Sequence, residues 1–152
     1  MTPMTADSSP SRGLVDTNIL VLRDWLGPDA LPDEFAISAV TLAELSFGPH
    51  AVLGDDQAAR TERARRTAVL QRAEAEFEPL PFDAPAARAY GELAAAMLAH
   101  GRMPRRRIAD LQIAATAMVH QLPLYTTNPD DYAGLEGYLV VVPVPGPPTP
   151  EG

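Results

Sequence analysis

Gly13-Leu14-Val15-Asp16-Thr17-Asn18, near the start of the chain, is the stretch that most strongly indicates the fold. A short run of small and apolar residues ends at a carboxylate, which predicts a buried strand with an acid at its end. Thr17 and Asn18 favour a turn or a helix cap directly afterwards. Because burying an unpaired charge is costly, Asp16 needs a partner, either a basic side chain or a metal ion.

Three more acids stand beside small or apolar residues, where a predicted strand ends or a helix begins. They are Glu44 in Val40-Thr41-Leu42-Ala43-Glu44-Leu45, Asp110 in Arg107-Ile108-Ala109-Asp110, and Asp131 in Thr126-Thr127-Asn128-Pro129-Asp130-Asp131-Tyr132. Taken singly, the aspartates also have ordinary explanations as helix caps or turn residues. The chain has no lysine, and most of its arginines lie elsewhere in polar runs. A divalent metal ion is therefore favoured over a basic side chain as the partner of these acids.

Apolar runs alternate with helical patterns, so we expect an α/β domain with a mostly parallel sheet of about five strands covered on both faces. The expected strands are residues 13–15, 35–37, 77–80, 123–126 and 138–142. The expected helices are 19–26, a helix from the Ser38 cap to Gly48-Pro49, 55–76, a helix from the Asp83 cap to about His100, and 107–120. Ligands of such sheets bind outside the carboxyl ends of the strands, where all four acids can converge.

The length of 152 residues suits a single domain. We expect a disordered tail at 1–11, one folded unit at 12–142 and a flexible tail at 143–152. The absence of cysteine excludes a disulfide framework, a thiolate metal site and a cysteine nucleophile. The net charge of −8 argues against a non-specific nucleic-acid binder, although an acidic site supplies part of that charge.

Neither a membrane segment nor a secretory signal is recognisable in the sequence. No apolar run approaches the roughly 20 residues that a bilayer-spanning helix needs, and residues 1–11 carry neither a basic nor an apolar signal region. We therefore expect a cytoplasmic protein with no membrane partner. Met4 is a second candidate for the start of the chain.

Oxygen ligands without cysteine or histidine suit Mg²⁺ or Mn²⁺ better than zinc. Such a site favours hydrolysis of phosphodiester bonds by one or two metal ions. We expect Asp16, Glu44, Asp110 and Asp131 to be both metal ligands and catalytic residues, with Asp130 as an alternative to its neighbour. Supporting polar groups are expected from Thr17, Asn18, Thr127 and Asn128. The run Arg105-Arg106-Arg107 either holds nearby acids or contacts the phosphate backbone of a nucleic acid.

Four motifs, taken in order, resemble the PIN-domain ribonucleases, and most closely the VapC-type toxins of bacterial toxin–antitoxin pairs. The motifs are Leu14-Val15-Asp16-Thr17-Asn18, Ala43-Glu44-Leu45-x-x-Gly48, Asp110-x-x-Ile113-Ala114-Ala115-x-Ala117, and Thr127-Asn128-x-x-Asp131-Tyr132. Asp16, Glu44 and Asp110 match the acidic triad of the family. Asp131 matches its fourth acid, although the family usually has Phe where this chain has Tyr132.

The resemblance covers residues 12–142 and implies a three-layer α/β/α domain. It also implies an Mg²⁺- or Mn²⁺-dependent endoribonuclease that cuts RNA, forms a homodimer and is bound by a cognate antitoxin. A phosphoryl-receiver domain is disfavoured because the chain has no lysine. A phosphatase with an aspartyl nucleophile would need a second Asp where Asn18 stands. A catalytically idle PIN-like module that acts by binding a protein remains the alternative.

Overall fold

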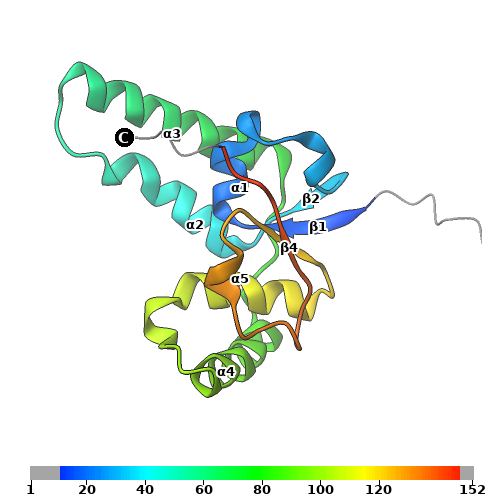
Figure 1. The fold of residues 1–152 in the computed structure, drawn as a ribbon. Helices are drawn as coiled ribbons and strands as arrows, with labels where there is room; N and C mark the ends of the chain where they lie inside the picture. Colours follow the sequence, from blue (N-terminus) through cyan, green and yellow to red (C-terminus); the bar gives the residue numbers. More distant parts are fainter. Residues whose placement is uncertain (1–10, 148–152) are drawn as a thin grey trace, which may run out of the picture.

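A four-stranded parallel sheet lies at the centre of this computed structural model, which describes residues 11–147 (Figure 1). The strands follow the order β2-β1-β3-β4, and their bounds are β1 Arg12–Val15, β2 Glu34–Ala36, β3 Leu124–Thr126 and β4 Val141–Pro143. All three pairings are parallel. The carboxyl ends of β1 and β3 therefore meet at one edge of the sheet, which is the edge where the sequence places its acids.

Among residues 11–147, five α-helices surround the sheet: α1 Thr17–Leu22, α2 Ala39–Phe47, α3 Gln57–Glu76, α4 Ala84–Ala99 and α5 Ile108–Val119. Ser38, Asp56 and Asp83 cap α2, α3 and α4 by accepting a backbone N–H with the side chain. Short 3₁₀ helices occupy Arg23–Trp25, Pro28–Ala30, Gly48–Ala51, Pro104–Arg106 and Pro129–Tyr132. The helix expected at 19–26 begins earlier, because Asp16 caps it, and it ends earlier in the first of these 3₁₀ turns.

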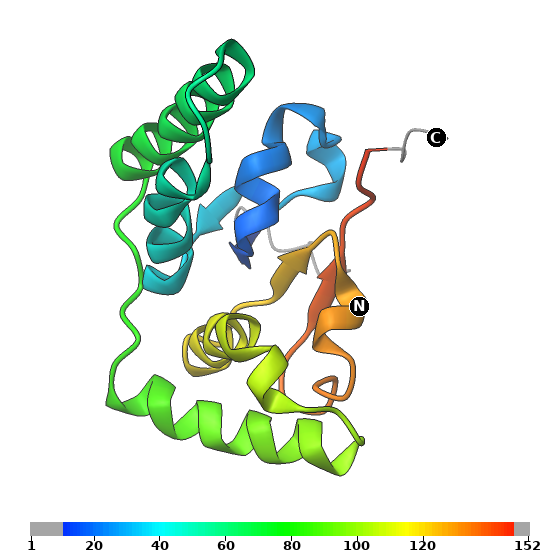
Figure 2. The same ribbon diagram turned by 90° about the vertical axis from the view of Figure 1, so that its left-hand side faces the viewer.

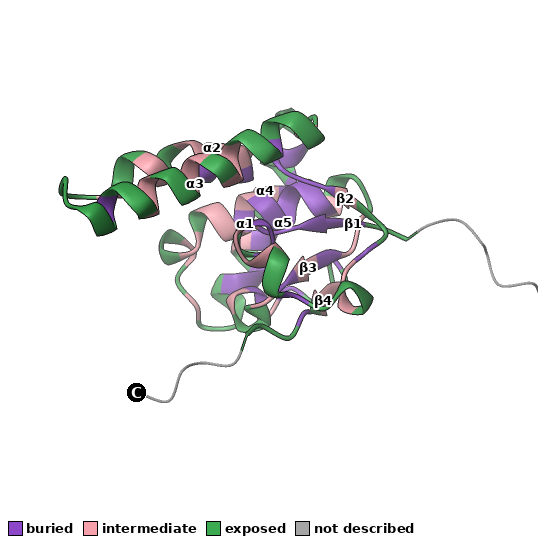
Figure 3. Ribbon diagram, turned by 90° about the horizontal axis from the view of Figure 1, so that it is seen from above, coloured by how far each residue is buried: buried purple, intermediate pink, exposed green. Residues whose placement is uncertain are grey.

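Each face of the sheet carries its own apolar core, so the domain has the expected three layers. On β1, Leu14 packs with Leu93 of α4 and Leu111 of α5, whereas Val15 packs on the opposite face with Ile19 of α1. This alternation is the two-residue period of a strand that is covered on both sides. Figure 2 shows the α2–α3 pair and the α4–α5 pair on opposite sides of the sheet. Figure 3 shows that α5 and β1 are largely buried, while α3 is largely exposed.

The expected strand at 77–80 is wrong, and among residues 11–147 the sheet has four strands where about five were expected. Leu80 forms only an isolated parallel bridge with Ser38, with hydrogen bonds from Leu80 N–H to Ile37 and from Ala39 N–H to Leu80. Pro79 and Pro81 flank this residue. A proline on each side of Leu80 restricts the backbone and removes the N–H groups that would pair on the opposite side, which disfavours a regular strand here.

The described residues reach into both expected tails. Ser11 donates its backbone N–H to the Asp33 carboxylate at 2.9 Å, and at the other end Val144 is buried and donates to the Thr126 carbonyl. Residues 1–10 and 148–152, the remainder of those tails, lie outside the described residues. None of the helices in the described part of the chain has the length and apolar character needed to cross a membrane.

Candidate active site

The four acids singled out in the sequence line one small cleft of about 100 Å³ at the carboxyl edge of the sheet. The lining residues are Asp16, Thr17, Asn18, Glu44, Asp110, Ile113 and Asp131. The acids come from four separate segments: the end of β1, the middle of α2, the first turn of α5 and the 3₁₀ helix that follows β3. Asp131 lines the cleft, whereas its neighbour Asp130 is exposed and does not.

Asp16 is the most deeply buried of the four acids, with only 6% of its surface exposed. One carboxylate oxygen accepts the Ile19 N–H at 3.3 Å, which caps α1, and the other accepts the Thr126 hydroxyl at 2.5 Å. Burial raises the pKa of Asp16; the bonds from Thr126 and Ile19 lower it, and the charges of Asp131 and Glu44 raise it again. These two hydrogen bonds fix the orientation of the Asp16 carboxylate.

Thr126 is a site residue that the sequence analysis missed, because only Thr127 and Asn128 of this segment were chosen. The strand register explains its position. Val15 pairs with Tyr125, so Asp16, which directly follows β1, lies beside Thr126, the last residue of β3. Thr126 is fully buried. The parallel pairing of β1 with β3 is the signal that identifies Thr126.

The supporting polar residues divide into two groups. Thr17 and Asn18 line the cleft, and the Thr17 hydroxyl donates to the Glu44 carboxylate at 2.6 Å. Thr127 and Asn128 are not among the lining residues, and the Asn128 amide instead donates to the Thr127 hydroxyl at 3.3 Å. In this structure the last residue of β3, not the two that follow it, provides the hydroxyl that holds an acid.

Arg107 is a basic partner for two of the acids, which corrects the expectation that the arginines lie elsewhere. Its guanidinium is 2.9 Å from the Asp131 carboxylate and 3.8 Å from that of Asp110. Burial, followed by the charge of Asp131, raises the pKa of Asp110 to about 6, and Arg107 opposes that rise. Of the two expected roles for Arg105–Arg107, Arg107 thus shows the first, holding nearby acids, while Arg105 and Arg106 are exposed.

The acids form a cleft, but they do not form a finished metal site in this structure. Within residues 11–147, no three Asp, Glu or His side chains are grouped so that they could hold one metal ion. Glu44 is bonded to Thr17, and Asp131 is paired with Arg107. The donor chemistry nevertheless fits a hard divalent cation, because carboxylate and hydroxyl oxygens are the ligands that Mg²⁺ and Mn²⁺ take.

Comparison with known proteins matches residues 14–135 to the family described as PIN domain. Ribonuclease VapC5 of Mycobacterium tuberculosis is 39% identical over 133 residues, covering 86% of this chain and 92% of the relative. VapC ribonuclease Y4jK of Sinorhizobium fredii is 38% identical over 141 residues, covering 81% of this chain and 93% of the relative.

Among solved structures, the chain is similar to a member of the VapBC family of toxin–antitoxin systems, VapBC-5, from Mycobacterium tuberculosis. The TM-score is 0.71 at 36% sequence identity, and the match covers 87% of this chain and 96% of the other. Sequence and fold agree over nearly the whole described region. The chain therefore belongs to the PIN-domain family and, within it, to the VapC-type proteins.

Proposed function

We propose that the chain is a metal-dependent endoribonuclease and the toxin component of a type II toxin–antitoxin pair. The observation that carries the proposal is that four acids from four distant segments line one cleft at the edge of the sheet. Stability alone does not account for carboxylates brought together from so far apart, because their mutual repulsion is unfavourable. RNA is the proposed substrate because the two relatives described above bear the name ribonuclease.

The four acids of the cleft would each bind the cation in a different way. Asp16 is fixed by two hydrogen bonds and presents its carboxylate in a set orientation. Glu44 and Asp131 have exchangeable partners in Thr17 and Arg107, which they can release to reach a cation. Asp110 would complete the set. Bound Mg²⁺ or Mn²⁺ would lower the pKa of a water molecule and neutralise charge on the phosphate.

Arg105 and Arg106 are proposed to contact the phosphate backbone of the RNA. They lie exposed on the 3₁₀ helix Pro104–Arg106, which directly precedes the segment that carries Arg107 and Asp110. The net charge of the chain is −8, so local positive charge is needed beside the acids. Neutralising both residues to glutamine should weaken RNA binding and make it less dependent on salt.

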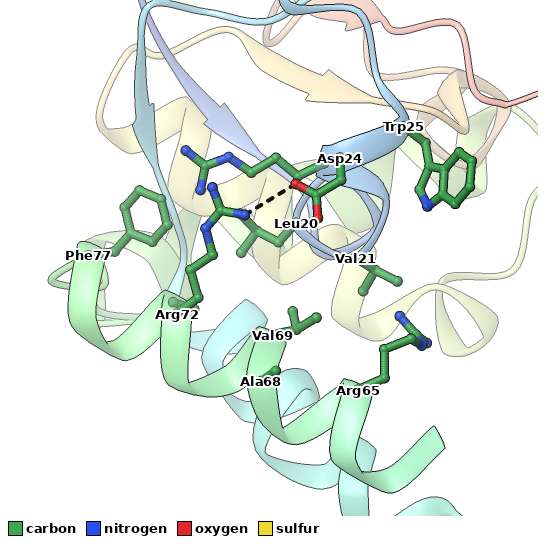
Figure 4. Close-up of a pocket in the computed structure, with 11 residues that line it drawn as sticks. Leu20, Val21, Asp24, Trp25, Arg65, Ala68, Val69, Arg72 and Phe77 are labelled. Atoms are coloured by element: carbon green, nitrogen blue, oxygen red, sulfur yellow. Dashed lines mark hydrogen bonds and ion pairs between the residues drawn. The ribbon is translucent and has the colours of Figure 1, made fainter. Parts of the chain in front are cut away.

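A larger cavity of about 300 Å³ between α1 and α3 is proposed as the binding site of the antitoxin. Leu20 and Val21 of α1 face Val69 of α3 across this space, with Arg72 reaching over to Asp24 (Figure 4). A neighbouring cavity of about 210 Å³ is also lined by Val21 and Val69, and it extends to Thr17 and Glu44 of the acid cleft. An apolar segment of a partner could therefore lie in this groove and reach the acids.

The partner proposal rests on the similar solved structure, which belongs to a toxin–antitoxin system. Ala68 lines the cavity and is exposed, so Ala68→Trp should block the groove without disturbing the core. We expect this variant to cleave RNA as the wild type does and to lose binding to the protein encoded by the adjacent gene. We also propose that the chain forms a homodimer and is located in the cytoplasm. Light scattering of the purified chain would measure its oligomeric state.

The direct experiment compares RNA cleavage by the wild type with that by Asp16→Asn and Glu44→Gln, using Asp130→Asn as the matched control. We expect folded but inactive variants at the two cleft positions and full activity in the control. Chelation should stop the wild type, and added Mn²⁺ should restore it. A folded wild type that never cleaves RNA with Mn²⁺ would instead favour the idle module that acts only by binding a protein.

A further inference from the structure

The hydroxyl of Tyr132 is buried without a hydrogen-bond partner. The residue is only 1% exposed, and its oxygen contacts no donor or acceptor among residues 11–147. A buried hydroxyl that makes no hydrogen bond is unfavourable, because it has lost its bonds to water. Phenylalanine would fill the same apolar space without this cost, so the oxygen itself requires an explanation.

Tyr132 directly follows the cleft residue Asp131, and its ring is buried in the core. It belongs to the same core cluster as Leu14, Leu111 and Ile113. Leu14 is two residues before Asp16, Leu111 directly follows Asp110, and Ile113 itself lines the cleft. Burial raises the pKa of the Tyr132 hydroxyl, and the negative charges of the four cleft acids raise it further. The unpartnered oxygen is therefore close enough to these acids to be affected by their charge.

The turn that carries Tyr132 is held in place from both sides. Arg102 donates to the carbonyl of Asp130 at 2.7 Å and to that of Ala133 at 3.2 Å. The Tyr132 carbonyl in turn accepts the N–H of Leu135. With the backbone fixed and the ring fully packed, the hydroxyl cannot turn outward to water.

Asp110 is the acid that lacks a donor. Asp16 accepts two hydrogen bonds, Glu44 accepts one, and Asp131 is paired with Arg107 at 2.9 Å. Among the described residues, Asp110 accepts no hydrogen bond and has only the distant contact of 3.8 Å with Arg107. The unpaired hydroxyl belongs to the 3₁₀ helix Pro129–Tyr132, which packs against α5, and the first turn of α5 carries the unpaired acceptor Asp110.

We propose that Tyr132 is a positioning residue whose hydroxyl donates to Asp110 through one bridging water molecule, and so orients that carboxylate toward a divalent cation. The inference rests on the proposed function, since it assigns a residue that acts through a cation ligand. Groups that orient metal ligands typically change metal affinity about 10- to 100-fold when they are removed.

The test is calorimetric titration of Mn²⁺ into the intact chain, the Tyr132→Phe variant and a matched control, Tyr90→Phe. Tyr90 lies in α4 and packs edge-on against Phe82, outside the cleft. We expect Tyr132→Phe to weaken Mn²⁺ binding about tenfold or more and to leave the thermal midpoint of the metal-free protein unchanged or higher. The control, Tyr90→Phe, should bind Mn²⁺ as the wild type does. A purely structural hydroxyl would alter the midpoint alone.

Two results would overturn the assignment. One is a Tyr132→Phe protein that binds Mn²⁺ as tightly as the wild type. The other is an equal loss of affinity when Tyr132→Phe is introduced into Asp110→Asn, because Tyr132 would then act through another acid. A wild type that binds no Mn²⁺ would refute the proposed function, and this inference with it, whereas an unaffected Tyr132→Phe refutes the inference alone.

Discussion

Asp110→Asn should stabilise the metal-free protein at neutral pH. The ordinary pKa of this carboxyl is 3.8, and the fold raises it to about 6. Since each pKa unit corresponds to about 1.4 kcal/mol, ionised Asp110 destabilises the folded state by about 3 kcal/mol above pH 6. Asparagine carries no charge and loses only the 3.8 Å contact with Arg107, so we expect a net gain of about 2 kcal/mol.

The sign and pH range of this effect follow from the raised pKa. Above about pH 6, Asp110 of the wild type is ionised in both the folded and unfolded states, and the folded protein bears the full free-energy cost of the buried charge. Below pH 3.8 Asp110 is neutral in both states, and this cost is absent. The advantage of Asp110→Asn should therefore disappear as the pH falls from 6 to below 4.

The assay is urea unfolding in EDTA between pH 4 and 7.5, with Asp130→Asn as the control. Far-UV circular dichroism is the suitable signal, because the single tryptophan, Trp25, is 78% exposed and reports poorly on the core. A variant that is no more stable than the wild type at pH 7.5, or whose advantage persists unchanged at pH 4, would refute the reasoning.

Three further perturbations test the cleft and the sheet. Thr126→Val removes the donor to Asp16, so we expect a loss of about 1–3 kcal/mol at pH 7.5 that shrinks in acid; Thr126→Ser should restore stability, and failure to do so would point to packing instead. Arg107→Gln removes the cation that competes for Asp131, so Mn²⁺ should raise its thermal midpoint more than that of the wild type; an equal or smaller rise would contradict this. Gly13→Ala would place a methyl group against the Tyr125 ring and should cost about 1–3 kcal/mol in urea unfolding; an unchanged midpoint would show that the ring moves freely.

The parts of the fold that the sequence predicts well are those governed by short-range chemistry. Ser38 and Asp83 were recognised as helix caps because a side-chain oxygen precedes a helical pattern, and the structure confirms both. The four acids were expected at one edge because parallel strands end there, and they line one cleft.

The features that could not be predicted from the sequence depend on contacts between distant segments. The position of Thr126 beside Asp16 follows from the pairing of β1 with β3, which lie 110 residues apart at this contact. Arg107 reads as part of a polar run, and only the turn that brings Asp131 beside α5 makes it a cleft residue. The strand expected at 77–80 failed because apolar patterning outweighed the two prolines beside Leu80.

The most direct measurement of the central claim is the affinity of Mn²⁺ for the wild type and for the single variants Asp16→Asn, Glu44→Gln, Asp110→Asn and Asp131→Asn. If four carboxylates hold the cation together, each variant should bind it at least about tenfold more weakly, while Asp130→Asn binds it as the wild type does. Binding that is unchanged in all four variants, or absent from the wild type, would contradict the account.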